Sequence, residues 1–406
     1  MSRSLQSLTV CAIILCSLVN SNEERLLRSQ VWNKKYADPK TVENKPENIN
    51  PLQCSPKMLQ ALSLQMPFNR CPLEDRPCVS HCIETACPVP TWLDSYYEAV
   101  IPKITPEGAQ FVGISVGCNK GIDAVNTLRM GSNSPRFSKE DWTHAMFEKT
   151  DSYQARGACN QGATPSFPLN SSKERPAIMH CIEPVPTTVE HLISSAAALG
   201  YDKGPHQTLV ISPFAISSEN TEGLFFPSGQ EGIETLSLSS CSNPNTREAL
   251  GCKHVSVYSL DSYTEKYMSS ELSDQKQHIN ILSIDAEGYD FDILQGAQKT
   301  LPRAEYLEFE HHALLPWRKQ SLGDAVSMLD VMGFNCYWAG QGKLWRLNGE
   351  NCFLDHYEAK CWSNVACANR NLAPELVDIM EDIFYSTLRA SNFRLDVRVK
   401  RNGAIK

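Results

Sequence analysis

The chain has 406 residues, an apolar content of 42% and a formal net charge of −8. Such a chain can bury a large core and suits one big globular domain or two. A nucleic-acid partner requires a positive face, and neither the net charge nor the sequence of the folded part supplies one. We interpret the short basic end Arg394–Lys406 as a frayed tail.

The first 21 residues have the pattern of a secretory signal peptide. Arg3 precedes the apolar run Leu8–Val19, and small or tolerated residues then precede Asn22, where we expect cleavage. The run is shorter than the roughly 20 residues of a membrane span. An uncleaved signal-anchor is the alternative. We expect the protein in the lumen of the endoplasmic reticulum or Golgi, or secreted, without a stable membrane span after cleavage.

Cysteine usage fits an oxidising compartment. Two of the 16 cysteines lie in the signal, and most of the others form two clusters. The clusters are Cys54, Cys71, Cys78, Cys82 and Cys87, and Cys336, Cys352, Cys361 and Cys367. In a secreted chain they predict disulfides, including bonds within Cys54–Cys87. A zinc site at Cys78–Cys87 with His81 is the alternative, but the spacing fits no common zinc ligand set, and we predict no metal site.

Five cysteines lie outside these clusters. Cys118 and Cys181 are in or beside predicted core strands, so we expect them to be free and buried. Cys241 and Cys252 flank a loop that a disulfide between them would close. Asn170 begins the only clear glycosylation sequon and lies in a polar loop.

Composition divides the rest of the chain into three parts. Residues 22–90 are a polar linker followed by a Pro- and Cys-rich segment that lacks its own large core. Residues 91–371 alternate strand and helix patterns, with a polar insertion at 131–175. Residues 372–406 are an amphipathic helix, Pro374–Leu388, and the tail.

The stretch Ile279–Glu310 is the centre of the predicted sheet. Ile279–Ile284 is a short β-branched run, typical of a buried parallel strand. A helix is predicted over residues 289–300, and Tyr306–Glu310 is a second buried strand. The stretch is therefore a strand, an acidic turn, a helix and a strand.

Polar residues follow both of these strands. Asp285 and Glu287 come after the first, and His311 and His312 come after the second, next to Glu310. Ligands of open α/β sheets bind beyond the carboxyl ends of the strands. A carboxylate or an imidazole at that edge is a candidate general base. The alternatives are a helix cap at Asp285 and two surface polar residues at the histidines.

The sheet is predicted to begin at Phe111–Val116. The turn Gly117–Gly121 and the helix Ile122–Met130 follow directly. Glycine at Gly117 allows a tight turn, and glycine at Gly121 allows close approach of a ligand or helix. The free N–H groups at the helix start point toward the turn. This arrangement suits a nucleotide-like ligand.

The next strand, Ala177–Ile182, ends at Glu183 and is followed by a helix over Thr187–Leu199. A carboxylate at the end of the second strand is where α/β folds hold a ribose diol, because it accepts from both hydroxyls. A solvated residue at the helix entry is the alternative. Further predicted strands are 207–216, 224–226, 254–260, 334–338 and 362–369, with a hairpin at 343–347 and helices at 139–149 and 322–332.

These motifs resemble the FkbM-type S-adenosylmethionine-dependent methyltransferases. Leu282–Gly288 (LSIDAEG) and the helix that follows it are similar to the family pattern LKID-x-EG-x-E with "vLkGa". Ile182–Pro186 resembles "EPnP", Ser212–Ser217 resembles "n-x-Avs", and Ser259–Tyr263 resembles "tLDdy". The ordered matches cover roughly residues 111–370.

The resemblance implies a class I methyltransferase fold. This is a Rossmann-like α/β domain with a mostly parallel seven-stranded sheet, an antiparallel last strand and helices on both faces, to which the Cys-rich N-terminal segment adds a cap. It implies S-adenosylmethionine as cofactor, bound by Gly117, Asn119, Gly121, Glu183, Ala215 and Asp285. It also suggests O-methylation of a hydroxyl on a glycan or small-molecule acceptor. From their place at adjacent strand ends, we predict Asp285, Glu287 and His311 as the catalytic residues.

Three positions depart from the family pattern. Ser115 stands where the family has Asp, Ser283 where it has Lys, and Asp290 where it has Glu. Ser115 removes a carboxylate near the cofactor, which slightly favours the alternative of a secreted binding module on a decayed methyltransferase scaffold. A dinucleotide-dependent oxidoreductase is a third class, but the chain lacks a G-x-G-x-x-G turn.

Overall fold

The structure is a computed structural model that describes residues 53–65, 85, 88–104, 109–147, 169, 174–204, 207–226, 241, 244–248, 251–274, 277–360 and 363–389. All of them belong to one compact unit, Pro51–Lys406. The predicted signal and linker, the sequon at Asn170, the basic tail and Cys71, Cys78, Cys82, Cys87 and Cys361 lie outside the described residues.

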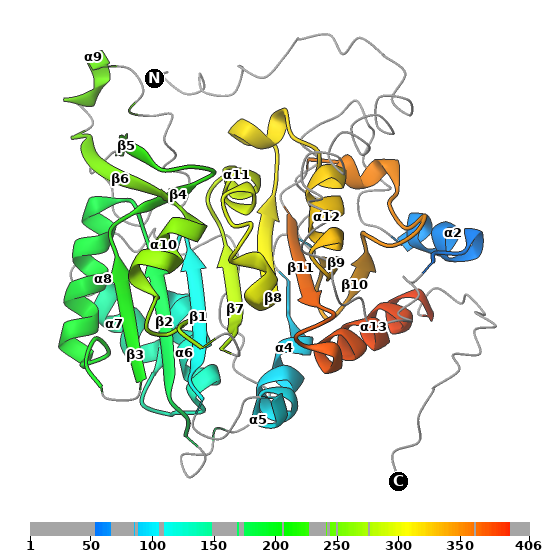
Figure 1. Ribbon diagram of the computed structural model, residues 1–406, viewed down its shortest axis with the longest axis horizontal. Coiled ribbons are helices and arrows are strands. Elements are labelled where there is room, and N and C mark those ends of the chain that lie inside the picture. The colour runs from blue at the N-terminus through cyan, green and yellow to red at the C-terminus, as the bar shows by residue number, and fades with distance from the viewer. Residues whose placement is uncertain are drawn as a thin grey trace, which may run out of the picture. The chain divides into compact units, whose positions relative to one another are not determined.

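Eight strands form one large sheet in the order β10-β9-β11-β8-β7-β1-β2-β3 (Figure 1). Their bounds are β1 (Phe111–Val116), β2 (Ala177–Ile182), β3 (Gln207–Ser212), β7 (Ile279–Ile284), β8 (Ala304–His311), β9 (Phe334–Ala339), β10 (Leu344–Arg346) and β11 (Ser363–Asn369). Strands β3, β2, β1, β7 and β8 run parallel, and β11 is antiparallel to both β8 and β9. The mostly parallel sheet with an antiparallel last strand is as predicted. The expected number of seven strands is wrong, because β10 pairs with β9 and adds an eighth at the edge.

The helices cover both faces of the sheet. They are α2 (Pro56–Gln65), α4 (Thr91–Ser95), the π-helical turn η2 (Tyr96–Val100), α5 (Ile101–Ile104), α6 (Ile122–Ser132), α7 (Lys139–Phe147), α8 (Pro186–Leu199), α9 (Pro244–Arg247), α10 (Leu260–Tyr267), α11 (Asp290–Gln295), α12 (Leu322–Val331) and α13 (Pro374–Arg389). Short 3-10 turns are η5 (Leu301–Arg303), η6 (Leu315–Arg318) and η7 (Asp355–Glu358).

Aromatic contacts assign the two faces. Phe111 of β1 packs against Tyr97 of η2 and against α6 at Gly131. Tyr337 of β9 packs against Phe384 of α13. Tyr337 is paired in register with β11, and the same position of β11 is paired with Glu308 of β8. Residues paired in this way project to the same side of the sheet, which is called here the α6 face. The opposite side, called the α12 face, is covered by α10, α11, η6 and α12.

A second sheet of three strands pairs in the order β4-β6-β5. It consists of β4 (Ala215–Ser217), β5 (Thr221–Phe226) and β6 (Lys253–Ser259). The single strand expected over 207–216 is therefore wrong. Pro213 has no N–H for a ladder, and the Phe214 N–H donates to the Ser212 carbonyl at 3.0 Å, so the chain turns between β3 and β4.

The helix expected over 289–300 is shorter than predicted. It ends at Gln295, and Gly296 lies so close to β4 that a Cβ there would be 2.3 Å from the Ser217 carbonyl oxygen. The N–H groups of Lys299 and Thr300 then donate to the carboxylate of Asp261 at 2.8–3.0 Å instead of continuing the helix. Packing of the second sheet against this helix, rather than local propensity, sets its length.

Four disulfides link the described residues: Cys54–Cys352, Cys118–Cys181, Cys241–Cys252 and Cys336–Cys367. The bridge from Cys241 to Cys252 is as predicted. The expectation that Cys118 and Cys181 are free is wrong, because their Cα atoms lie 5.2 Å apart across the start of the β1 turn. Cys54 does not pair within its own cluster but with a cysteine 298 residues later, which fixes α2 to the β10 end of the sheet.

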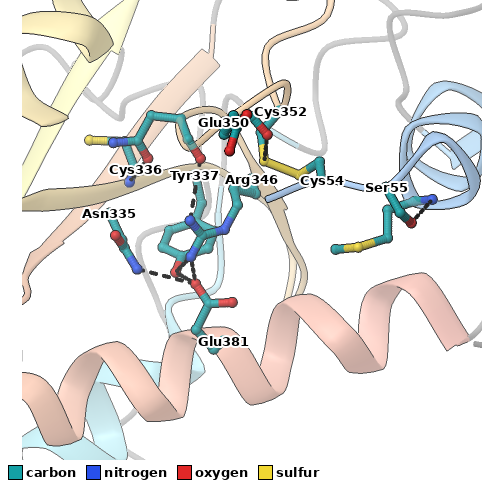
Figure 2. Close-up of a disulfide and its surroundings, with 11 residues drawn as sticks. Cys54, Ser55, Asn335, Cys336, Tyr337, Arg346, Glu350, Cys352 and Glu381 are labelled. Carbon is teal, nitrogen blue, oxygen red and sulfur yellow. Dashed lines mark hydrogen bonds and ion pairs between the residues drawn. A yellow bond between two sulfur atoms is a disulfide. The ribbon is translucent and has the colours of Figure 1, made fainter. Parts of the chain in front are cut away.

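A buried ion pair attaches α13 to this end of the sheet (Figure 2). Arg346 of β10 pairs with Glu381 of α13, and the Tyr337 hydroxyl donates to the same carboxylate. The amide of Asn335 adds a further contact at 3.3 Å. Arg346 is only 1% exposed, and among the described residues Glu381 is the one acidic partner of its charge. Within the described residues, no helix combines the length and apolarity that a bilayer crossing requires.

Glu381→Gln should lower the free energy of unfolding by about 3 kcal/mol, because it leaves the Arg346 charge buried without its counter-ion. Urea denaturation monitored by tryptophan fluorescence measures this. The matched control is Asp330→Asn, which breaks the more exposed pair with Arg370 (2.7 Å) and should cost about 1 kcal/mol or less. Equal losses in the two variants would contradict a special role for the buried pair.

Candidate functional site

The turn after β1 has room only for glycine at its first position. Gly117 has φ +74°, and a Cβ on it would lie 1.7 Å from the carbonyl oxygen of Asp285, beyond the neighbouring strand β7. Asn119 and Gly121 also have positive φ values, 48° and 71°. The turn is thus held against β7 at Gly117, and at Gly121 it is packed so closely that a Cβ would lie 2.8 Å from Leu192 and 2.9 Å from Trp142.

A disulfide and two hydrogen bonds fix the turn to β2. The N–H groups of Gly117 and Cys118 both donate to the Ile182 carbonyl at 3.0 Å. Cys118 is bonded to Cys181, the residue before Ile182. Both sulfur-bearing side chains are buried. No local pattern predicted this bond, because 63 residues separate the two cysteines.

Glu183 lies beside this turn and is 5% exposed. Its Oε2 accepts from the Asn119 N–H and its Oε1 from the Val185 N–H, both at 2.8 Å. Burial raises the pKa of this carboxyl to about 7, and the two backbone donors offset part of that effect. Each oxygen keeps a lone pair for a further donor, so the carboxylate can accept from two neighbouring hydroxyls.

Asp290 organises the acidic turn after β7. It is fully buried and accepts from the N–H groups of Ala286 (3.4 Å), Gly288 (3.3 Å) and Glu310 (3.2 Å). Burial, followed by the nearby charge of Asp285, raises its pKa to about 7. Asp290 therefore ties the acidic turn to the end of β8. The sequence showed it only as a departure from the motif, and its role was missed.

Asp285 is exposed at the carboxyl edge between these two buried carboxyls. Its N–H donates to the Val116 carbonyl at 2.9 Å, which places it next to the β1 turn. Its charge contributes to the raised pKa of both Glu183 and Asp290. Glu287, with φ +50°, is half-buried in the same turn. The structure thus brings together Gly117, Asn119, Gly121, Glu183, Asp285 and Glu287.

Two predicted site residues lie elsewhere. Ala215 is buried in the apolar core of the second sheet with Phe226, Val255 and Val257. His311 is fully buried on the α12 face, with its ring centroid 4.6 Å from that of Trp317 and 5.6 Å from that of Trp338. Because side chains alternate along a strand, the position of His311 points away from the α6 face that carries Glu308 and Glu310.

His312 is the other histidine at this edge and is 5% exposed. Its Nε2 lies 3.7 Å from Oε2 of Glu310, the residue whose N–H reaches Asp290. Burial lowers the pKa of His312 to about 4, so the imidazole is neutral at physiological pH. Within the described residues, no group of three or more His, Cys, Asp or Glu side chains has the arrangement of a metal site.

One family model matches part of the chain. Residues 157–336 match the family model described as "Methyltransferase FkbM domain", which confirms the resemblance of the motifs. The matched range contains Glu183, Asp285 and Asp290, and the β1 turn precedes it. No curated protein and no solved structure shows a significant similarity to the sequence.

Replacing Cys118 and Cys181 together by serine should loosen the β1 turn. The chain-entropy model predicts a loss of about 4 kcal/mol in the free energy of unfolding for a loop of this length. Hydrogen exchange of the Gly117 and Cys118 amides should accelerate, because the bond holds their donors against Ile182. Urea denaturation and exchange mass spectrometry measure the two effects.

The matched control replaces Cys241 and Cys252, whose separation is 11 residues. It should cost about 3 kcal/mol in the same model and leave exchange in the β1 turn unchanged. Unchanged exchange in the Cys118 and Cys181 variant would show that hydrogen bonds alone hold the turn.

Proposed function

We propose that the protein is an S-adenosylmethionine-dependent O-methyltransferase that acts on a hydroxyl of a glycan or small metabolite in the secretory pathway. The observation that carries the proposal is Glu183, a buried carboxylate held by the Asn119 and Val185 N–H groups beside the glycine turn. A carboxylate at this edge suits a ribose diol. The four disulfides fit an oxidising compartment.

The residues at the edge fit this cofactor chemically. Glu183 would hold the ribose, and the backbone of Gly117–Gly121 would lie along the rest of the cofactor. The turn carries no side chain at Gly117, because one would clash with Asp285. The carboxylates of Asp285 and Glu287 suit a positively charged sulfonium. When bound, the cofactor supplies a methyl group that is already activated for transfer.

A hydroxyl acceptor is a poor nucleophile unless a base removes its proton during attack. His312 is neutral at physiological pH, so its ring can take up a proton, and Glu310 at 3.7 Å would stabilise the resulting imidazolium and offset the burial that lowers the pKa of His312. Glu310 also donates its N–H to Asp290, which connects this pair to the acidic turn. We therefore assign the base to His312 in place of His311, which is enclosed by Trp317 and Trp338.

Glu183→Gln should weaken S-adenosylmethionine binding by about 1.5–3 kcal/mol, because it removes a charge-assisted hydrogen bond. Isothermal titration calorimetry measures this. Wild-type affinity should fall as the pH is lowered through about 7, since protonation removes the accepting carboxylate, and the variant should lack that dependence.

The control is Glu190→Gln on the exposed side of α8, which should change neither affinity nor its pH profile. If wild-type protein binds no cofactor, the chain is better described as a binding module on a methyltransferase scaffold. If Glu183→Gln binds like the wild type, the ribose is held elsewhere.

His312→Ala should lower turnover by about 10²–10⁴-fold with little change in cofactor affinity, because a base acts in the chemical step. Transfer of labelled methyl from S-adenosylmethionine into a glycan extract measures turnover. The matched control is His278→Ala, which removes a histidine from a second His–Glu pair (3.1 Å to Glu305) at the opposite ends of β7 and β8. If His311→Ala folds and loses turnover while His312→Ala keeps it, the base is His311 and not His312.

A further inference from the structure

Three polar residues form a row across the middle of the sheet on the α6 face. Ser115 of β1 is the register partner of Ser283 of β7, which is the partner of Glu308 of β8. Partners on neighbouring parallel strands project to the same side. The row lies immediately below the carboxyl edge, since Ser115 is two residues before Gly117 and Ser283 is two residues before Asp285.

The hydroxyls of the two serines are not used in contacts within the described part of the protein. Ser115 is 8% exposed and Ser283 is half-buried. Among the described residues, neither hydroxyl makes a hydrogen bond, and neither is one of the fully buried side-chain atoms without a partner. Two hydroxyls that lie side by side beneath the candidate site can therefore exchange hydrogen bonds with a ligand.

Glu308 extends the row and is itself half-buried. It accepts from the Tyr306 hydroxyl at 2.6 Å and from the Asn364 side-chain amide at 2.8 Å. In the part of the chain that the structure describes, it has no cationic partner. A carboxylate has about four acceptor positions, so two remain for donors on a ligand. The nearby Asp123 adds negative charge, which opposes the approach of an anion.

The position of Glu308 in the sheet suits an acceptor. Glu183 ends β2, and β8 lies three strands away through β1 and β7, which is roughly 14 Å at about 4.8 Å per strand. Glu308 is therefore far from the carboxylate assigned to the ribose. It is close to Glu310, which follows it on β8 by two residues and contacts His312.

We propose that Ser283 and Glu308, with Ser115 at the boundary to the cofactor site, form the acceptor subsite and that the acceptor is an uncharged, polyhydroxylated ring such as a neutral sugar. The two serines exchange hydrogen bonds with hydroxyls, and Glu308 accepts from them. Phosphate, sulfate or uronate groups are rejected by Glu308 and Asp123. This inference rests on the proposed function and specifies its substrate class.

The departures from the family pattern support this assignment. The positions that differ, Ser115 for Asp and Ser283 for Lys, are Cα partners on adjacent strands. The two departures therefore place two neutral hydroxyls on adjacent strands, next to the carboxylate of Glu308.

Saturation-transfer NMR on the full chain, loaded with S-adenosylhomocysteine, tests the subsite without turnover. The probes are a panel of methyl glycosides of neutral hexoses and the corresponding methyl uronosides. We expect binding of at least one neutral glycoside and at least tenfold weaker binding of its uronoside. Glu308→Gln and Ser283→Ala should each weaken the neutral glycoside at least threefold and leave the dissociation constant of S-adenosylhomocysteine unchanged.

The control is Ser195→Ala on α8, which removes a serine hydroxyl remote from the row and should change the binding of neither ligand. If no neutral glycoside binds while S-adenosylhomocysteine does, the inference is overturned and the proposed function stands. If Glu308→Gln and Ser283→Ala weaken S-adenosylhomocysteine instead, the row belongs to the cofactor site and the inference is again wrong. Absence of cofactor binding in the wild type would reject the proposed function and this inference together.

Discussion

The close approach of Gly117 to the carbonyl of Asp285 is the constraint on which the site depends. Strands β1 and β7 are neighbours at the centre of the sheet. Gly117 and Asp285 are the first residues after these two strands, and no side chain fits between them. The glycine turn and the acidic turn are therefore one packed unit. The disulfide from Cys118 to Cys181 joins that unit to β2, and Asp290 joins it to β8. Four strands thus contribute to one rigid edge.

This edge contains buried carboxyl groups at an energetic cost. Glu183 and Asp290 both have a pKa raised to about 7, chiefly by burial. Each binds a proton more tightly in the folded chain than in the unfolded chain. Their ionisation between about pH 4 and pH 7 therefore lowers the free energy of unfolding as the pH rises. Backbone N–H donors offset part of this cost, which explains why both side chains lie at turns where such donors are free.

Side chains alternate along β8, so the polar residues of this strand lie on one face of the sheet and the packed residues on the other. Glu308 and Glu310 project to the α6 face, whereas Phe309 and His311 pack against Trp317 on the α12 face. One residue of register thus decides whether a histidine is a core residue or a candidate base. The same alternation aligns Ser115 and Ser283 with Glu308. The α6 face therefore carries a polar row at a depth where the strands are otherwise apolar.

Local sequence determined the strands and the edge. The bounds of Phe111–Val116, Ala177–Ile182 and Ile279–Ile284 agree with the structure, because buried parallel strands are continuous β-branched runs. The glycine turn, Glu183 and Asp285 were found because they follow those strands directly. Tertiary structure alone decided the partners of Cys118 and Cys54 and the short helix α11, since each depends on segments distant in sequence. It also decided that His311 is packed away and that Ser115, Ser283 and Glu308 stand in one row, because register between strands is set by the whole core.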